Sequence, residues 1–192
     1  MDLINSGPIS RSLHIWKVKV PLRIKIFMWF VHKQVILTKD NLIKRRWVGS
    51  SRCCFCDQDE TIQHLFLECP LAKLLWRTIH IAFNINPPVD IESLFGTWLA
   101  GVEHHTAARI RIGICALMWA IWNCRNDLIF NRQHNLSFLQ VIFRATAWIR
   151  MWSLLTPMDS REPLVTGCNQ WEMIARAIFN RFGWRSHNRI GV

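Results

Sequence analysis

The stretch that decides the fold is residues 53–69, CCFCDQDETIQHLFLEC, in which three cysteines and one histidine follow the spacing C-x2-C-x7-H-x4-C. Structural zinc sites use four thiolate or imidazole ligands arranged as a tetrahedron. A C-x-x-C pair on a tight turn supplies two ligands, and the following histidine and cysteine complete the set. The spacing therefore predicts that Cys53, Cys56, His64 and Cys69 bind one zinc ion.

Four occupied ligand positions leave no coordination position for water or substrate, so the zinc ion is expected to be structural. Two alternatives stay open. The three thiols and the histidine could instead be ordinary buried core residues. Cys54 could replace Cys53 as the first ligand, although the step from Cys54 to Cys56 is shorter than the usual C-x-x-C turn.

The residues around the cysteines indicate how the ligands are placed. Asp59 is a candidate N-cap, and Glu60 is favourable in the first turn of a helix that includes His64. Pro70 suits the first turn of the next helix, expected over residues 71–79, because a first-turn residue needs no N–H partner.

The composition indicates a folded intracellular protein. Its 192 residues are 51% hydrophobic, with 11 Trp, 11 Phe and no Tyr, which predicts a folded, mainly helical chain. Seven cysteines without a paired framework, and an opening sequence without a secretory pattern, indicate a reducing intracellular compartment, with the nucleus as one candidate. The apolar run over residues 112–122 is too short to span a bilayer, so no membrane association is expected.

The net charge of +11 is unevenly distributed. Residues 1–52 contain eleven Lys and Arg against two acidic residues, residues 53–103 contain two against seven, and residues 104–192 contain eleven against four. A basic, Trp-rich leading segment, in which Lys and Arg are interleaved with Trp and Phe from Trp16 to Trp47, favours a nucleic-acid partner, either RNA or single-stranded DNA. Aromatic side chains can stack bases while cations hold phosphates, although a solvated basic face with its aromatic residues in the core has the same composition. The preferred phosphate contacts are the cations next to the zinc motif: Lys44, Arg45, Arg46 and Arg52.

Hydrophobic periodicity predicts helices along most of the chain. Pro21 opens a helix with Ile24, Phe27, Met28 and Val31 on its apolar face, after a short alternating piece at residues 14–20. Further helices are expected at residues 39–46 (after Thr38, with Leu42 and Ile43 inward), 71–83, 91–99, 104–131, from a cap at Asn135 or Ser137 to about residue 155, and 170–182, with a loop at 156–167.

The predicted fold class is mainly α. A small zinc-stapled helical domain is expected over residues 14–83, followed by a linker at residues 84–90 that contains two prolines. Residues 91–192 are expected to form a helical connector-like region, in which the two long helices pack as an antiparallel hairpin or as part of a bundle.

Four stretches resemble the zinc-binding domain of plant reverse transcriptases: residues 15–17 (IWK), 20–29 (VPLRIKIFMW), 38–42 (TKDNL) and 53–76. In that family the domain lies downstream of the polymerase in LINE-type, non-LTR retrotransposon polyproteins, often before a ribonuclease H domain. The resemblance covers about residues 14–80, and it implies that the zinc ligands are Cys53, Cys56, His64 and Cys69. Residues 119–127, WAIWNCRND, resemble the connector that often follows.

The chain departs from that family in its catalytic parts. A polymerase site needs paired carboxylates, typically beside a Tyr, yet the sequence has no Tyr and no Asp-Asp pair. A ribonuclease H site needs four clustered carboxylates, and beyond residue 104 the acidic residues are scattered: Asp127, Asp159, Glu162 and Glu172. No catalytic residue is therefore expected. A protein-interaction scaffold and a decayed retroelement fragment remain alternatives to a nucleic-acid-binding module.

Overall fold

The computed structural model describes residues 15–130 and 136–182, and within them the fold is mainly α, as predicted. An isolated antiparallel β-bridge pairs Arg52 with Asp59. The helices in chain order are α2 (Leu22–His32), α3 (Lys39–Lys44), the π-helical turn η1 (His64–Glu68), α4 (Pro70–Phe83), α5 (Ile91–Phe95), α6 (His104–Ile129), α7 (Phe138–Ser153) and α8 (Met158–Phe182).

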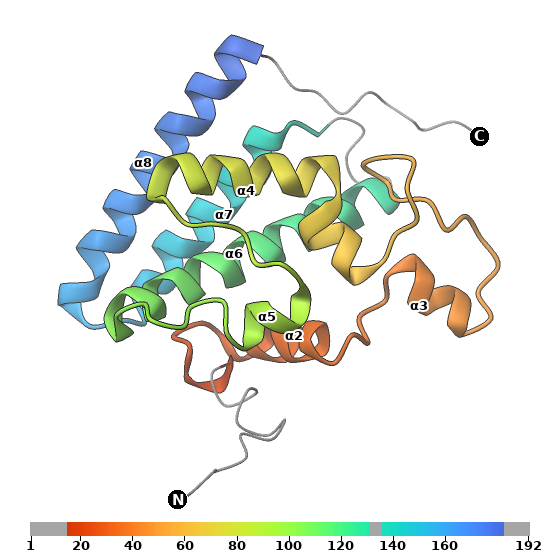
Figure 1. The fold of residues 1–192 in the computed structure, drawn as a ribbon, viewed down its shortest axis with the longest axis horizontal. Helices are drawn as coiled ribbons and strands as arrows, with labels where there is room; N and C mark the ends of the chain where they lie inside the picture. The colour runs from red at the N-terminus through yellow and green to blue at the C-terminus, as the bar shows by residue number, and fades with distance from the viewer. Residues whose placement is uncertain (1–14, 131–135, 183–192) are drawn as a thin grey trace, which may run out of the picture.

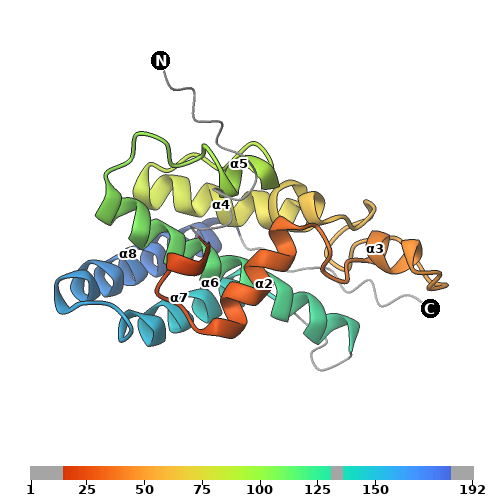
Figure 2. The same cartoon turned by 90° about the horizontal axis from the view of Figure 1, so that it is seen from below.

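The long helix α6 lies at the centre of the fold (Figures 1 and 2). It packs along α7 as an antiparallel pair, which confirms the predicted hairpin, and α8 packs on α7. Helix α4 crosses over α7 and α8, whereas α2 crosses α6 on another side. Ser137 caps α7 through a capping box, as predicted; the alternative cap, Asn135, lies outside the described residues.

Helix α2 buries the four side chains that its periodicity selected, Ile24, Phe27, Met28 and Val31. The Phe27 ring lies 5.1 Å from the Trp119 ring of α6 in an edge-on arrangement, and 6.3 Å from the ring of Phe66 in η1. Aromatic pairs in this geometry add to the stabilisation from burial alone. Helix α2 therefore joins the metal-site region to α6.

Helix α3 begins after Thr38, as predicted, but ends two residues before the predicted Arg46. The prediction that Ile43 points inward is wrong, because this side chain is 42% exposed. Asn41 is buried instead, and its amide donates hydrogen bonds of 2.8 Å to the carbonyl groups of Gln34 and Ile36. The inner side of α3 faces the backbone of a loop. The residue at that position therefore needs a hydrogen-bonding side chain rather than an aliphatic one.

The predicted loop at residues 156–167 is wrong, because residues from Met158 to Phe182 form one continuous helix despite Pro163 in its interior. Leu164, Cys168 and Trp171 are buried along this helix, and the Trp171 indole donates a 2.7 Å hydrogen bond to the Thr78 hydroxyl of α4. Tertiary burial of this face therefore outweighs the low helix propensity of proline.

Two smaller predictions also need correction. The helix expected over residues 91–99 is only Ile91–Phe95, and Asp90 begins it with a capping box to Ser93. In the piece expected to alternate, residues 15–17 form a helical turn; His14 lies outside the described residues. Ile15, Val18 and Val20 are all buried, because turning the chain brings them to one side.

Arg125 of α6 and Glu60, which lies before η1, form a buried ion pair. Their side chains are 4% and 0% exposed, and a guanidinium nitrogen lies 2.5 Å from a carboxylate oxygen. Arg125 also donates to the Leu37 carbonyl at 3.2 Å, and Glu60 accepts from the Lys39 backbone N–H at 3.0 Å. The pair therefore connects α6, the start of α3 and the segment that leads to η1.

Buried residues on both sides of residues 84–90 belong to one continuous hydrophobic cluster. The division into units at residues 14–83, 84–90 and 91–192 stays a prediction. None of the helices that the structure describes is both long and apolar enough to cross a membrane.

We expect Arg125→Met to lower the free energy of unfolding of the zinc-loaded protein by about 3–5 kcal/mol, because Glu60 would remain buried without a counterion. Urea denaturation followed by circular dichroism measures the change. The double variant Glu60→Gln, Arg125→Met should recover part of the loss, since no unpaired charge then remains buried.

The matched control is Arg144→Met. Arg144 pairs with Asp127 across the α6–α7 hairpin, but the Arg144 side chain is 36% exposed, so its ion pair is screened by solvent. The expected loss there is about 1 kcal/mol or less. Similar losses in the Arg125 and Arg144 single variants would contradict the central role given to Glu60 and Arg125.

Candidate metal centre

The first two candidate ligands lie on a short backbone loop that we call the knuckle, residues 51–60. Its ends are held by hydrogen bonds from the Cys53 N–H to the Gln58 carbonyl and from the Glu60 N–H to the Ser51 carbonyl, both 2.8 Å. Inside the loop, the Phe55 N–H lies 3.4 Å from the Cys53 sulfur, which it can reach as a donor. An N–H directed at sulfur is a typical feature of a thiolate ligand's surroundings.

Two predictions for this loop are wrong. Asp59 is not a helix N-cap, because its backbone pairs with Arg52 to close the knuckle. Glu60 does not lie in a first helical turn but in the buried ion pair with Arg125. Thr61 takes the capping position instead, and its hydroxyl accepts a 3.0 Å hydrogen bond from the His64 N–H.

The other two candidate ligands are placed by the π-helical turn η1. The Cys69 N–H donates a 2.7 Å hydrogen bond to the His64 carbonyl, which is an i to i+5 bond. In an α-helix, residues five apart point roughly 140° away from each other, since each residue turns by about 100°. The wider π turn brings residue 69 back above residue 64, so both side chains face the knuckle.

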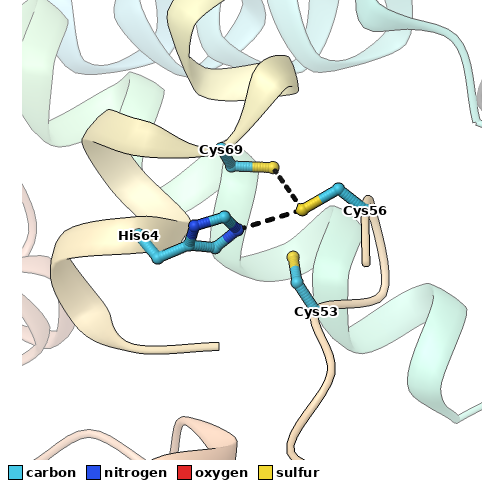
Figure 3. Close-up of side chains that lie close together, drawn as sticks. All are labelled: Cys53, Cys56, His64 and Cys69. Carbon is cyan, nitrogen blue, oxygen red and sulfur yellow. Dashed lines mark hydrogen bonds between the residues drawn. The ribbon is translucent and has the colours of Figure 1, made fainter. Parts of the chain in front are cut away.

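The four predicted ligands converge. One donor atom from each of Cys53, Cys56, His64 and Cys69 lies within 4.8 Å of the others, and Figure 3 shows all four side chains directed at a common centre. The Cys56 sulfur lies 3.1 Å from His64 Nε2 and 3.9 Å from the Cys69 sulfur. A tetrahedron with metal–sulfur bonds of about 2.3 Å has edges of about 3.8 Å, so a zinc ion fits this arrangement.

Hydrogen bonds within the cluster shift the pKa values of its thiols in opposite directions. Hydrogen bonds from Cys54 and Cys69 hold the pKa of Cys53 far below its ordinary value. The same contact with Cys53, together with burial, raises the pKa of Cys69 well above its usual range, and burial raises the pKa of Cys56. These contacts favour the thiolate form at Cys53 and the protonated form at Cys56 and Cys69.

Cys54 belongs to a second, overlapping group with Cys53 and Glu60. The hydrogen bond to Cys53, followed by burial, raises the pKa of Cys54 well above its ordinary value. The carboxylate of Glu60 already accepts from Arg125. The four-donor group contains Cys53 rather than Cys54, which favours Cys53 as the first ligand.

The four predicted phosphate contacts are exposed and lie close to the metal centre in the chain. Lys44, Arg45 and Arg46 are at the end of α3, and Arg52 is at the start of the knuckle. Lys44 is also within 3.1 Å of the Asp40 carboxylate. Among residues 15–130 and 136–182, no ion pair is formed by the other three guanidinium groups.

Sequence reasoning gave Glu60 the wrong role and missed Thr61 and Arg125. None of the three is a ligand, but all of them position the ligand-bearing segments. Arg125 lies within residues 119–127, the stretch that resembles the connector often found after the zinc-binding domain. The sequence offered no sign that this arginine is buried or that its partner is 65 residues earlier.

Comparisons with known proteins agree with the site. Residues 7–76 match the family model described as zinc-binding in reverse transcriptase, and all four converging side chains lie inside that segment. A curated protein of Arabidopsis thaliana, named "Putative ribonuclease H protein", is 33% identical over 63 residues, which cover 32% of this chain. The match spans only 10% of that relative's length. No solved structure matches the chain.

These comparisons confirm the predicted resemblance for the matched segment: residues 7–76 are similar to the zinc-binding domain of reverse transcriptases. Zinc is accordingly the metal to which this segment is suited, and Cys53, Cys56, His64 and Cys69 are placed to bind it. Three thiolates and one imidazole fill a tetrahedral site, so the bound ion would stabilise the fold rather than activate water.

We expect the purified protein to contain one zinc ion per chain, and each of Cys56→Ser, His64→Ala and Cys69→Ser to lose it. Metal content is measured by plasma mass spectrometry after dialysis. The variants Cys53→Ser and Cys54→Ser form a matched pair, because the residues are neighbours and only Cys53 lies in the four-donor group. Zinc retained by Cys53→Ser but lost by Cys54→Ser would reassign the first ligand.

Zinc binding near pH 7 should release about two protons, because the contacts within the cluster raise the pKa of Cys56 and Cys69 and lower that of Cys53. Zinc affinity should therefore rise with pH. Calorimetric titration in buffers of different ionisation enthalpy counts the protons. Cys54→Ala removes a hydrogen bond to the Cys53 thiolate, so its count should move toward three; an unchanged count would contradict this role for Cys54.

Proposed function

We propose that this chain is a non-catalytic zinc-binding module, derived from a retrotransposon reverse transcriptase polyprotein, that binds RNA or single-stranded DNA. The observation that supports this most directly is the exposure of four cations that shortly precede the metal ligands in the chain, Lys44, Arg45, Arg46 and Arg52. Cations on a surface bind phosphates with little regard to sequence. An intracellular, nuclear location would suit such a partner.

The proposed role of zinc is to hold these cations in one place. Cys53, Cys56, His64 and Cys69 would hold the ion, which closes the knuckle onto η1. Helix α3 is fastened to the same knuckle, because the Asp40 N–H donates to the Glu60 carbonyl at 3.2 Å and the Lys39 ammonium donates to the Arg52 carbonyl at 2.5 Å. The metal site therefore supports the surface on which the cations lie.

The distribution of potential ligands supports a non-catalytic role. In the part of the chain that the structure describes, groups of three or more His, Cys, Asp or Glu occur at the metal centre and at its overlapping neighbour, Cys53–Cys54–Glu60. Phosphoryl-transfer sites with two metal ions instead gather several carboxylates. Asp127 and Glu172 are engaged with Arg144 and Arg150 across the α7 interfaces.

A second function, a scaffold for a protein partner, is favoured by the outer face of α2. Leu22, Ile26 and Phe30 lie four residues apart on this helix and are all exposed. An apolar row on a helix is a common protein-docking surface. This face is separate from the cations of α3, so the two functions can be tested independently.

We expect the zinc-loaded protein to bind a fluorescein-labelled single-stranded oligonucleotide with an affinity that falls steeply with salt, measured by fluorescence anisotropy. Lys44→Glu with Arg45→Glu should weaken binding strongly and reduce the slope of log K against log salt by about 1.4, which corresponds to two lost phosphate contacts. No binding of the wild type at about 50 mM salt would overturn the proposal.

The matched control is Lys73→Glu with Arg77→Glu, which makes the same change in net charge at two exposed positions of α4. The control should keep most of the affinity and the salt slope. Equal losses in both double variants would mean that binding depends on overall charge rather than on the surface beside the zinc site.

A further inference from the structure

The end of α3 has an unusual residue in a well-known type of helix terminus. The Trp47 N–H donates to the Leu42 carbonyl at 3.1 Å, and the Arg46 N–H donates to the Ile43 carbonyl at 2.9 Å. This pair of hydrogen bonds defines a Schellman motif, whose second-to-last position has a left-handed backbone. Arg46 occupies that position with φ of 65°. Glycine is the usual residue there, because a side chain is disfavoured at positive φ.

An arginine at this position of positive φ costs conformational free energy relative to glycine. Its side chain is exposed, and among residues 15–130 and 136–182 it forms no ion pair that would offset the left-handed backbone. A disfavoured backbone conformation kept for a particular side chain is a recognised indication of a functional residue. The positive φ of Arg46 therefore singles it out from the other exposed cations.

The next residue, Trp47, lies in a space that only a glycine leaves open. A Cβ atom at Gly49 would be 2.1 Å from Cη2 and 2.2 Å from Cζ2 of the indole. Gly49 does not have a positive φ, so the close approach of the ring is the physical reason for a glycine at this position. The indole is thus backed by the main chain, yet 42% of the Trp47 surface remains open to solvent.

We propose that Arg46 and Trp47 form a contact for an unpaired nucleotide, in which a base stacks on the Trp47 indole and Arg46 binds an adjacent phosphate. Lys44 and Arg45 precede this pair directly, so cations are available for neighbouring phosphates. Stacking on an aromatic side chain requires a base that is free of its own duplex neighbours. The ligand class is therefore a single strand, and this inference rests on the proposed function.

The test compares two probes on the zinc-loaded chain, a fluorescein-labelled oligothymidylate and an abasic strand of the same length. Both have the same phosphates, but only the first can stack. Trp47→Ala should weaken binding of oligothymidylate about tenfold and leave the abasic strand unchanged. Trp47→Phe should keep most of the affinity, and Gly49→Ala, which displaces the indole without removing it, should resemble Trp47→Ala.

The matched control for the tryptophan is Trp16→Ala, because Trp16 is 41% exposed and lies outside the proposed contact. It should leave binding of both probes unchanged. A matched duplex should bind more weakly than oligothymidylate in the wild type, and that difference should shrink in Trp47→Ala.

Arg46→Gly separates the functional role of the arginine from a structural one. Glycine relieves the left-handed backbone, so the melting temperature should rise by about 2–4 °C, while binding of both probes should weaken several-fold because one phosphate contact is lost. Arg45→Gly removes the same charge from a position with a negative φ of −95°. It should lower the melting temperature instead.

The outcomes are distinguishable. If the wild type binds neither probe, the proposed nucleic-acid-binding function is wrong. The second proposed function, a scaffold that binds a protein partner through the outer face of α2, would then be tested. If the wild type binds both probes equally and Trp47→Ala changes neither, the phosphate-binding function survives and the stacking contact is overturned. Arg46→Gly with raised stability and undiminished binding would likewise overturn the role of Arg46.

Discussion

The fold depends on a charge that is completely removed from water. The Glu60 carboxylate has no exposed surface, and its compensation comes from Arg125, 65 residues later in the chain, and from the backbone of Lys39. The desolvation of two such ions is costly and is offset only when the geometry is good and the remaining donors and acceptors are used. Arg125 meets this condition with further bonds to Leu37 and Asn126 and with its guanidinium 4.9 Å from the Trp122 ring centre. Any other relative arrangement of the knuckle, α3 and α6 would therefore leave Glu60 or Arg125 without its partner.

This arrangement has a bearing on where the zinc-binding unit ends. The matched segment stops at residue 76, but its central aromatic residues Phe27 and Phe66 share a cluster with Trp119 of α6. The ion pair and the aromatic contacts both cross the same boundary. In physical terms, the metal centre lies on a helical body that includes α6, and the stability of the two parts is coupled.

Local sequence patterns predicted the structure correctly where the burial of a residue depends on its position around a single helix. They gave wrong predictions where segments far apart in the sequence come into contact. The buried face of α2 and the four converging ligands follow from spacing alone, since a period near 3.6 and a C-x-x-C turn are local features. Pro163 indicated a loop, but the burial of Trp171 and Leu164 on α4 and α7 is a tertiary effect that propensity does not contain. Glu60 was predicted to lie in a first helical turn, because a carboxylate is electrostatically favourable at a helix N-terminus. Only its contact with Arg125 explains its burial.

The π-helical turn at His64–Glu68 has a consequence for the rest of the bundle. Cys69 is followed at once by Pro70, the first residue of α4, so the position of the last ligand also fixes the rotational phase at which α4 begins. Removing one residue between His64 and Cys69 would turn every later side chain of α4 by about 100° around its axis. Leu71 and Leu75, now almost wholly buried, would leave the core together with the ligand. The histidine-to-cysteine interval is therefore a length constraint on helix packing as much as on metal binding, and insertions or deletions should be tolerated before the knuckle rather than within this interval.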